Sequence, residues 1–398
     1  MMKTLIAASA VALLLMGCGG GSDDDPVAST PLANNPATPA TPATPATPVA
    51  PAAPAASADV AAASLATANR AGLVALASNQ AKVAVYDVAA DTGDSLRITF
   101  DRFAGTYAIQ VLNTRNGQVA SSGTFTTTAA GDRTTYTANG LALTVDQRTR
   151  LLSGTITQGA RTASVIGTGY VAGNIASLAG DYLFAGSVRN VSDGRDRDTL
   201  DGVIRVDAGG NVQVCDEGVF NAAGACVDRS GSGTPELSQF VLAAQDGIVV
   251  LRQNGANVGV VHVLASERGV GLLVDGAGFN RADRTLRAGT LAAVAPFALT
   301  TDVYGNYACT AQGTLRAEIT LAGTSAQLRR LFNNTSRTEL AWYNRAIDDD
   351  RLFNQDGLLS LSATASLDDD SVVLPVSGSL LVMVDDADDD QTATCTRL

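Results

Sequence analysis

The chain has 398 residues, among them 39 acidic and 27 basic side chains and one histidine, for a net charge of −12. A chain this acidic is not expected to bind nucleic acid, nor anionic lipid through charge alone. Its length is enough for two or three domains.

Residues 1–17 have the organisation of a secretory signal peptide. Lys3 precedes an apolar run from Leu5 to Met16, and the small residue Gly17 comes directly before Cys18. The run is about twelve residues long, whereas a helix needs roughly 20 apolar residues to span hydrocarbon. A cleaved signal is therefore predicted. An ordinary signal followed by an incidental cysteine, or an uncleaved membrane anchor, are the alternatives.

The segment Leu15-Met16-Gly17-Cys18 resembles the lipid-attachment site of bacterial lipoproteins. The resemblance implies cleavage before Cys18 and a mature N-terminus that carries diacylglycerol and an N-acyl chain such as palmitate. It also implies sorting to the outer membrane, because Gly19 follows the cysteine where retention in the inner membrane favours Asp. The expected partner is thus a membrane, reached through the lipid anchor, on the periplasmic side or at the cell surface.

Residues 18–57 are predicted to be a lipidated, disordered spacer. Glycines and Asp23-Asp24-Asp25 are followed by Ala-Thr-Pro repeats between Pro36 and Pro48, and no aromatic residue occurs. Such a composition cannot bury enough apolar area to offset the entropy lost on ordering. A spacer of this kind would lift the following domains away from the membrane.

The remaining chain is predicted to be all-β, with a short N-terminal helix possible in the alanine-rich stretch Ala58–Ser78. Beyond Lys82, short runs rich in Val, Ile, Thr, Tyr and Leu alternate with Gly, Asn and Asp. Asn116-Gly117, Asp246-Gly247 and Asn254-Gly255 are typical hairpin turns. Antiparallel meanders forming small barrel-like or sandwich-like domains are expected at 58–175, 176–295 and 296–398. A second short helix is possible at Ser325–Phe332.

A weak internal similarity accompanies these segments. Gly105-Thr106-Tyr107, Gly180-Asp181-Tyr182 and Gly305-Asn306-Tyr307 each precede a predicted strand. The triplet resembles the Gly-x-Trp opening of lipocalin-like barrels, with tyrosine in place of tryptophan. The resemblance implies an aromatic side chain that plugs the end of a barrel or sandwich.

Apart from Cys18, four cysteines remain, an even number in a chain expected to be exported. Of the three possible pairings we favour Cys215–Cys226, across a Gly-containing turn, and Cys309–Cys395, which would tie the last segment's first strand to the C-terminus. A four-thiolate zinc site is the alternative, although no Cys-x-x-Cys pair is present.

No catalytic residues are predicted. His262 is the single histidine and lies in the run Val258–Leu264, which is otherwise apolar on both faces, so a packed side chain is expected there. A Ser-His-Asp triad would have to use this residue, and no Gly-x-Ser-x-Gly elbow occurs.

A Ca²⁺ site is the one candidate metal centre. The carboxylates of Asp193, Asp196, Asp198 and Asp201 alternate along a Gly-containing stretch, and Ca²⁺ binds six to eight oxygens. The stretch lacks the Glu that closes an EF-hand loop, and interleaved arginines reduce its charge. Solvated turn residues are the simpler interpretation, and no other cofactor is expected.

Three functions fit these observations. The first is a non-enzymatic, lipid-anchored cell-envelope protein whose β-domains bind a ligand or an envelope protein or help to maintain the envelope. The second is a structural or adhesive surface protein with acidic loops stiffened by Ca²⁺. The third is a hydrolase that uses paired carboxylates, for which a single Trp342 and few other aromatics offer little surface for stacking sugars.

Overall fold

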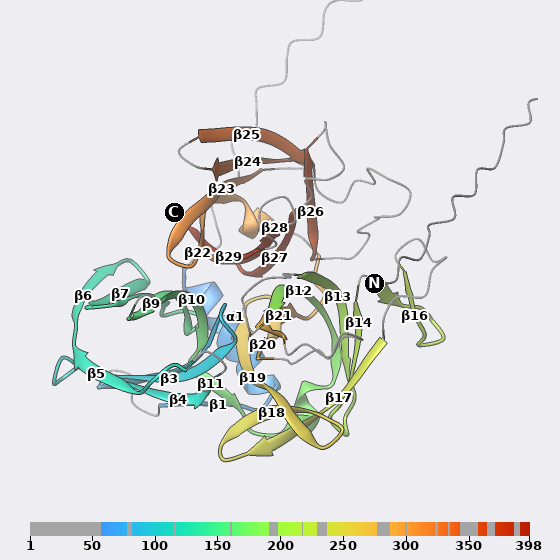
Figure 1. Cartoon of the computed structure of the whole chain (residues 1–398), viewed down its shortest axis with the longest axis horizontal. Coiled ribbons are helices and arrows are strands. Elements are labelled where there is room, and N and C mark those ends of the chain that lie inside the picture. Colours follow the sequence, from blue (N-terminus) through green and yellow to red (C-terminus); the bar gives the residue numbers. More distant parts are fainter. Residues whose placement is uncertain are drawn as a thin grey trace, which may run out of the picture. The chain divides into compact units, whose positions relative to one another are not determined.

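A computed structural model describes residues 57–77, 82–114, 117–159, 161–190, 198–216, 218–228, 237–276, 287–298, 301–322, 325–332, 335–342, 357–363, 371–385 and 391–398. Among them there is one α-helix, α1 (Ser57–Arg70), and most other residues belong to strands. The strands form three large antiparallel sheets (Figure 1). The prediction of an all-β chain built from antiparallel meanders is therefore confirmed.

The first sheet, here called the N-terminal meander, has nine strands: β2 (Val83–Ala90), β3 (Asp94–Asp101), β4 (Thr106–Asn113), β5 (Ser121–Thr124), β6 (Thr126–Ala130), β7 (Arg133–Ala138), β8 (Leu141–Asp146), β9 (Leu151–Gln158) and β10 (Arg161–Thr168). Its two edge strands, β5 and β6, are consecutive in sequence and separated by Phe125 alone. The sheet must therefore roll until its edges meet at Phe125, whose N–H donates to the Gly105 carbonyl at 3.0 Å.

The second sheet is a closed barrel, here called the central barrel. Its strands are β12 (Gly180–Asn190), β13 (Asp198–Val206), β14 (Asn211–Asp216), β17 (Leu237–Gln245), β18 (Ile248–Gln253), β19 (Ala256–Ser266), β20 (Gly269–Asp275) and β21 (Arg287–Val294). Asp246-Gly247 and Asn254-Gly255 join β17 to β18 and β18 to β19, and all four residues have positive φ, as type I′ turns require. These two predicted hairpin turns are confirmed, and Asn116 of the third, Asn116-Gly117, lies outside the described residues.

Helix α1 packs on the central barrel and not on the meander that follows it in sequence. The Ser64 hydroxyl donates to the Ala265 carbonyl of β19 at 3.1 Å, and Ala68 belongs to the hydrophobic cluster that fills this barrel. The helix ends at Arg70, before Gly72 (φ +61°), and Leu73–Ala75 forms strand β1, paired with β11 (Tyr170–Ala172). The predicted helix in this region is thus confirmed in a shorter form.

The third sheet, the C-terminal barrel, is also closed. It contains β22 (Gly305–Ala311), β23 (Thr314–Ala322), β24 (Ser325–Phe332), β25 (Thr335–Trp342), β26 (Leu359–Ala363), β27 (Ser371–Ser377), β28 (Leu380–Asp385) and β29 (Gln391–Arg397). The possible helix at Ser325–Phe332 was wrong, because this segment is β24, paired with β23 and β25. Burial alternates along it, and the inward set includes Arg330, which donates to the Ser371 hydroxyl at 3.0 Å.

Several strands of the central barrel are buried on both faces, as the apolar run of β19 suggested. Val263 belongs to the cluster inside the barrel, whereas Leu264 belongs to a second cluster on its outer side. That cluster includes Ile166 of the N-terminal meander and Leu374 and Val382 of the C-terminal barrel. All three sheets therefore share one apolar contact region.

The turn between β2 and β3 lies directly against β21. Gly93 has φ +80°, and a Cβ atom there would lie 2.7 Å from the Cβ of Ala288. The neighbouring Thr290 hydroxyl donates to the Ala90 carbonyl at 2.6 Å. A side chain at position 93 would therefore push the meander away from the barrel.

The two closed barrels begin alike. A 3₁₀-helix, η1 (Ile175–Leu178) or η2 (Thr301–Val303), precedes each Gly-x-Tyr strand. The Tyr182 hydroxyl donates to the Leu178 carbonyl at 2.7 Å, and the Tyr307 hydroxyl to the Val303 carbonyl at 2.8 Å. Both side chains are buried, which raises the pKa of each phenol to about 12. Tyr182 and Tyr307 are thus buried where their barrels begin, whereas Tyr107 of the third triplet is half-buried.

Candidate functional site

A hollow lies on the central barrel between β13, β14, β17 and the tip of the β18–β19 hairpin. It arises because the β17–β18 ladder stops at Val241 and Arg252, whereas β17 remains paired with β14 as far as Leu237. A bulge between Leu251 and Arg252 in the ladder with β19 bends the hairpin further. The hairpin tip thus leaves β17 and opens a groove.

The groove has a volume of about 420 Å³, which lies within the roughly 300–1,000 Å³ typical of small-molecule sites. Its apolar part consists of Val212, Phe240 and Val241. The other lining residues are polar: Arg205, Asp207, Asn211, Gln213, Gln239, Arg252, Gln253 and Asn254. It is therefore a polar site with a small apolar floor.

The polar side chains form two rows because inward and outward positions alternate along each strand. Arg205, Gln213 and Gln239 lie opposite one another on β13, β14 and β17, while their apolar neighbours along each strand are buried in the barrel. Asn211, Val241 and Arg252 form the next row. Apart from the Asn254-Gly255 turn, the sequence analysis had singled out none of these residues.

Both arginines of the groove are already engaged. Arg205 donates from Nε and Nη2 to the two carboxylate oxygens of Asp181 at 2.7 and 2.9 Å, which raises its pKa, and it lies 4.2 Å from the ring centre of Phe220. Arg252 donates from Nε to Asn257 at 2.9 Å and from Nη2 to Gln245 at 3.1 Å. Each guanidinium is thus fixed in position and retains Nη1 for a ligand.

Asp207 at the β13–β14 turn is also satisfied within the protein. Its carboxylate accepts from the Asn211 side chain at 2.7 Å and from the backbone N–H groups of Asn211 and Gly209 at 2.9 and 2.8 Å. The Asn211 side-chain bond, followed by that backbone amide, lowers the pKa of Asp207. This carboxylate therefore stays ionised and shapes the turn.

His262 lies in a buried polar cluster between the N-terminal meander and the central barrel. Its Nε2 is 2.8 Å from the Ser95 hydroxyl, which donates to Asp275. Because the hydroxyl proton goes to Asp275, the histidine must be the donor in the other contact. A catalytic triad would place the carboxylate on the histidine instead.

Burial is the main cause of the low pKa of His262. The side chain is 3% exposed, and Ser95 and Asp275 are fully buried. Burial lowers the pKa to about 4, opposed by the nearby Asp87 carboxylate and reinforced by Arg97. Those two residues form a bidentate pair with distances of 2.6 and 2.8 Å. The arrangement fits the expected packed residue.

Part of the predicted Ca²⁺ set lies outside the described residues, namely Asp193 and Asp196. Asp198 is the first residue of β13, and Asp201 lies within the same strand and is half-buried. In the described part of the chain no three His, Cys, Asp or Glu residues are grouped so as to hold a metal ion. The Ca²⁺ site remains a prediction. Cys18, the signal and the spacer up to Ala56 also lie outside the described residues.

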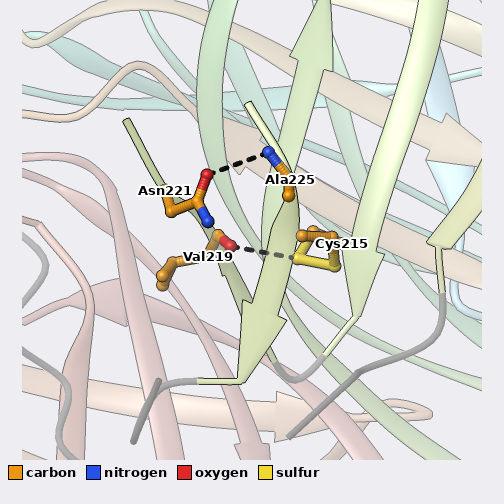
Figure 2. The surroundings of a disulfide bond; sticks show 5 residues. Cys215, Val219, Asn221 and Ala225 are labelled. Atoms are coloured by element: carbon orange, nitrogen blue, oxygen red, sulfur yellow. Dashed lines mark hydrogen bonds between the residues drawn. A yellow bond between two sulfur atoms is a disulfide. The ribbon is translucent and has the colours of Figure 1, made fainter. Parts of the chain in front are cut away.

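Both predicted disulfides are present. Cys215–Cys226 ties β14 to the small hairpin of β15 (Gly218–Phe220) and β16 (Cys226–Asp228), and Cys215 Sγ lies 3.5 Å from the Val219 carbonyl oxygen (Figure 2). Cys309–Cys395 joins β22 to β29, the first and last strands of the C-terminal barrel. Pairing by sequence order was therefore correct.

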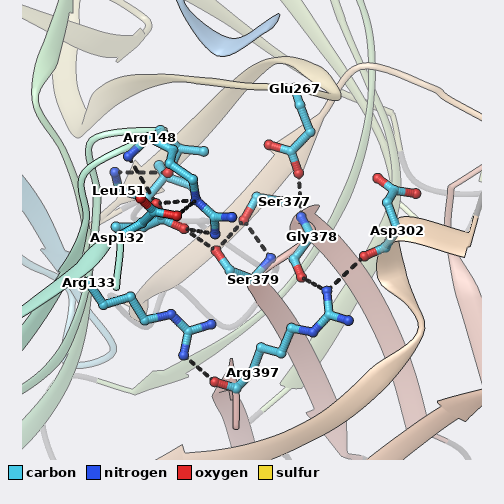
Figure 3. Close-up of polar contacts among 12 residues, drawn as sticks. Asp132, Arg133, Arg148, Leu151, Glu267, Asp302, Ser377, Gly378, Ser379 and Arg397 are labelled. Carbon is cyan, nitrogen blue, oxygen red and sulfur yellow. Dashed lines mark hydrogen bonds and ion pairs between the residues drawn. The ribbon is translucent and has the colours of Figure 1, made fainter. Parts of the chain in front are cut away.

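A polar junction connects the three sheets at the β27–β28 turn (Figure 3). The Ser379 hydroxyl donates to Asp146 of the N-terminal meander at 2.8 Å, and the Gly378 N–H donates to Glu267 of the central barrel at 2.5 Å. Burial acts to raise the pKa of Asp146, but bonds from Arg148 and Ser379 outweigh it, and the pKa is lowered. These carboxylates are engaged in holding the sheets together.

No helix within the described ranges has the length and hydropathy needed to cross a bilayer.

Comparison with known proteins assigns no family. No family model and no curated protein matches the chain. A crystal structure of a protein of unknown function from the DUF3598 family, from Nostoc punctiforme, is 7% identical, with 79% of this chain and 95% of that chain covered and a TM-score of 0.17. A likeness this remote carries no argument about function, which has to be argued from the groove and the sequence.

Proposed function

We propose that this protein is a lipid-anchored component of the cell envelope that acts by binding and not by catalysis. The groove on the central barrel supports the binding role most directly. The side chains of Gln213, Gln239 and Gln253 line it and have no hydrogen-bond partner within the described part of the chain. Among the described residues that line it there is one carboxylate, Asp207, which is satisfied within its own turn. Such a groove offers recognition without an evident proton-transfer group.

The anchor rests on the sequence Leu15-Met16-Gly17-Cys18 and on the proline-rich stretch that follows it. Acyl chains contribute roughly 0.8 kcal/mol per buried CH₂, so two or three of them hold a protein on a bilayer. The two disulfides suit an oxidising compartment outside the cytoplasm.

Anchoring is tested by palmitate labelling and membrane fractionation of cells that express the wild type, Cys18→Ala or the control Ser22→Ala. We expect the wild type and Ser22→Ala to be labelled and to sediment with membranes, and Cys18→Ala to be unlabelled and released. A Cys18→Ala protein that still sediments, together with an unlabelled wild type, would refute the anchor.

Binding is tested by hydroxyl-radical footprinting of intact cells against the purified protein. Val241 in the groove is 44% exposed, and Leu315 of the C-terminal barrel is a matched control with 39% exposure. We expect Val241 to be protected several-fold in cells relative to Leu315. Equal oxidation of Val241 in both preparations would remove the groove as a binding site.

A further inference from the structure

Most of the polar side chains that line the groove are carboxamides. Gln213 and Gln239 are directly opposite each other on neighbouring strands, and Gln253 and Asn254 face them from the hairpin tip. None of these four amides has a partner within the described residues. Each amide combines donors with an acceptor, so together they match ligand groups that both donate and accept, as hydroxyls do.

The two arginines that line the groove already bind other side chains of the protein. The two oxygens of Asp181 face Arg205, and Arg252 is held by Asn257 and Gln245, which also bond to each other at 3.0 Å. In each arginine the Nε–Nη2 edge, one of the two forks that bind phosphate or carboxylate, is therefore already occupied. The remaining Nη1 atoms can each donate singly to a neutral oxygen.

The groove is also a poor match for lipid or for an extended peptide. Val212 and Phe240 are 4% and 3% exposed, so Val241, at 44%, is the one lining apolar side chain that offers much area to an acyl chain. An extended peptide binds by adding a strand to a sheet edge, and in this closed barrel the only edge at the groove is the short part of β17 beyond its described ladder with β18, Leu237–Phe240. Uncharged ligands rich in hydroxyl groups remain.

We propose that the groove of the central barrel binds a short, uncharged glycan through the side-chain amides of Gln213, Gln239, Gln253 and Asn254. The arginines fix the rim, since the Arg252, Asn257 and Gln245 side chains form a closed hydrogen-bonded triangle. This specificity rests on the proposed binding function of the groove. Because few apolar atoms are buried, binding is weak, with a Kd on the order of 0.1–1 mM.

The test is saturation-transfer NMR with the detergent-solubilised full chain. Maltotriose and chitotriose are the glycan probes, and trialanine and inorganic phosphate are the contrasting ligands. We expect at least one trisaccharide to bind, with an affinity that changes less than about twofold between 50 and 500 mM NaCl because no ion pair forms.

Two substitutions remove the amides while keeping side-chain length. Gln213→Met and Gln239→Met should each weaken glycan binding about fivefold, as the loss of one hydrogen bond does, and the double variant about 20-fold or more. Gln327→Met on β24, a strand amide that is exposed like that of Gln239, is the matched control and should leave binding unchanged. Unaltered thermal unfolding of each variant shows that the fold is retained.

The outcomes separate this proposal from the general binding function. Binding of trialanine or phosphate without the sugars, or sugar binding that survives in the double variant, overturns the glycan assignment. Protection of Val241 in cells together with no sugar binding in solution means that the groove binds a different ligand class. Absence of both refutes the proposed binding function itself.

Discussion

The central and C-terminal barrels have the same number of strands and the same plugged entrance but are closed differently. We call the pairing of a barrel's first and last strands its seam. In the central barrel the seam is a long ladder, in which Leu183–Asn190 pairs with Arg287–Val294. In the C-terminal barrel only Tyr307–Thr310 pairs with Thr394–Arg397, and the Cys309–Cys395 disulfide lies within that short ladder. A covalent link thus accompanies the weaker seam.

The two barrels also differ in what surrounds the buried tyrosine at the end of each, Tyr182 or Tyr307. Around Tyr182 the entrance is covered by apolar residues from earlier in the chain, including Ala68, Leu73 and Tyr170. At the other barrel Arg397, from its own last strand, donates to the carbonyls of Asp302, Tyr304 and Gly378 at 3.1, 2.5 and 3.1 Å. The end of the central barrel is thus covered by residues outside the barrel, whereas the end of the C-terminal barrel is held by its own last strand.

Loss of the seam disulfide should give the largest effect. The double change Cys309→Ser and Cys395→Ser opens a link between residues 86 apart and should lower the free energy of unfolding by about 4.5 kcal/mol. Urea denaturation measures the change. Cys215→Ser with Cys226→Ser is the matched pair, and its separation of 11 residues predicts about 3 kcal/mol. Equal losses would show that the seam is not specially dependent on its disulfide.

Removing the arginine of the C-terminal plug should come next. Arg397→Met leaves three carbonyls without their charged donor and should cost about 3 kcal/mol in thermal unfolding. Arg329→Met, which breaks an exposed pair with Glu318 on the same barrel, should change stability by less than about 1 kcal/mol. If the two variants were equally stable, Arg397 would not hold the plug.

Acid should loosen the central barrel and spare the C-terminal one. Since the folded-state pKa of His262 is about 4, below its ordinary 6.5, the unfolded chain binds a proton that the folded chain does not. The contribution of neutral His262 to the free energy of unfolding is complete above about pH 6.5. It is lost as the pH falls towards 4, by up to about 3 kcal/mol.

His262→Gln should flatten this difference, because glutamine can keep the bond to Ser95 without titrating. Hydrogen-exchange protection, corrected for the intrinsic exchange rate at each pH, should fall between pH 7 and pH 4.5 in β19 of the wild type and much less in β28. A similar loss of protection in both strands would assign the acid sensitivity to the carboxylates of the whole chain.

Removing the hydroxyl of Tyr307 or Tyr182 should give the smallest change in stability. Tyr307→Phe deprives the Val303 and Gly378 carbonyls of a donor, whereas Tyr182→Phe affects Leu178 alone. We expect losses of about 2 and 1 kcal/mol in thermal unfolding. The reverse order would mean that the apolar cover of the central barrel depends on its tyrosine more than the contacts indicate.

Much of this fold could be predicted because its information is local. Asn-Gly and Asp-Gly turns, alternating strands and cysteine order identified the hairpins and both disulfides. The strand at Ser325–Phe332 was missed because buried Arg330 occupies an inward position, which hides the two-residue period. Its partner Ser371 is 41 residues away and gives no local signal.

The candidate site was harder to predict for a related reason. The groove exists because one ladder ends at Val241 while another continues, and such a divergence depends on three strands at once. The contact of His262 with Ser95 spans 167 residues. From one sequence, only the type of His262's surroundings could be predicted, not its partner.

The position of helix α1 has a mechanical consequence. Tension on the chain ahead of Ser57 reaches Ser64 and Ala68 first, and through them β19, before any strand of the N-terminal meander. The load would then shear the helix along the barrel wall, where many contacts share it, and would not peel one strand at a time. Pulling from this end should therefore meet high resistance, and the meander next in sequence would stay unloaded until α1 detaches.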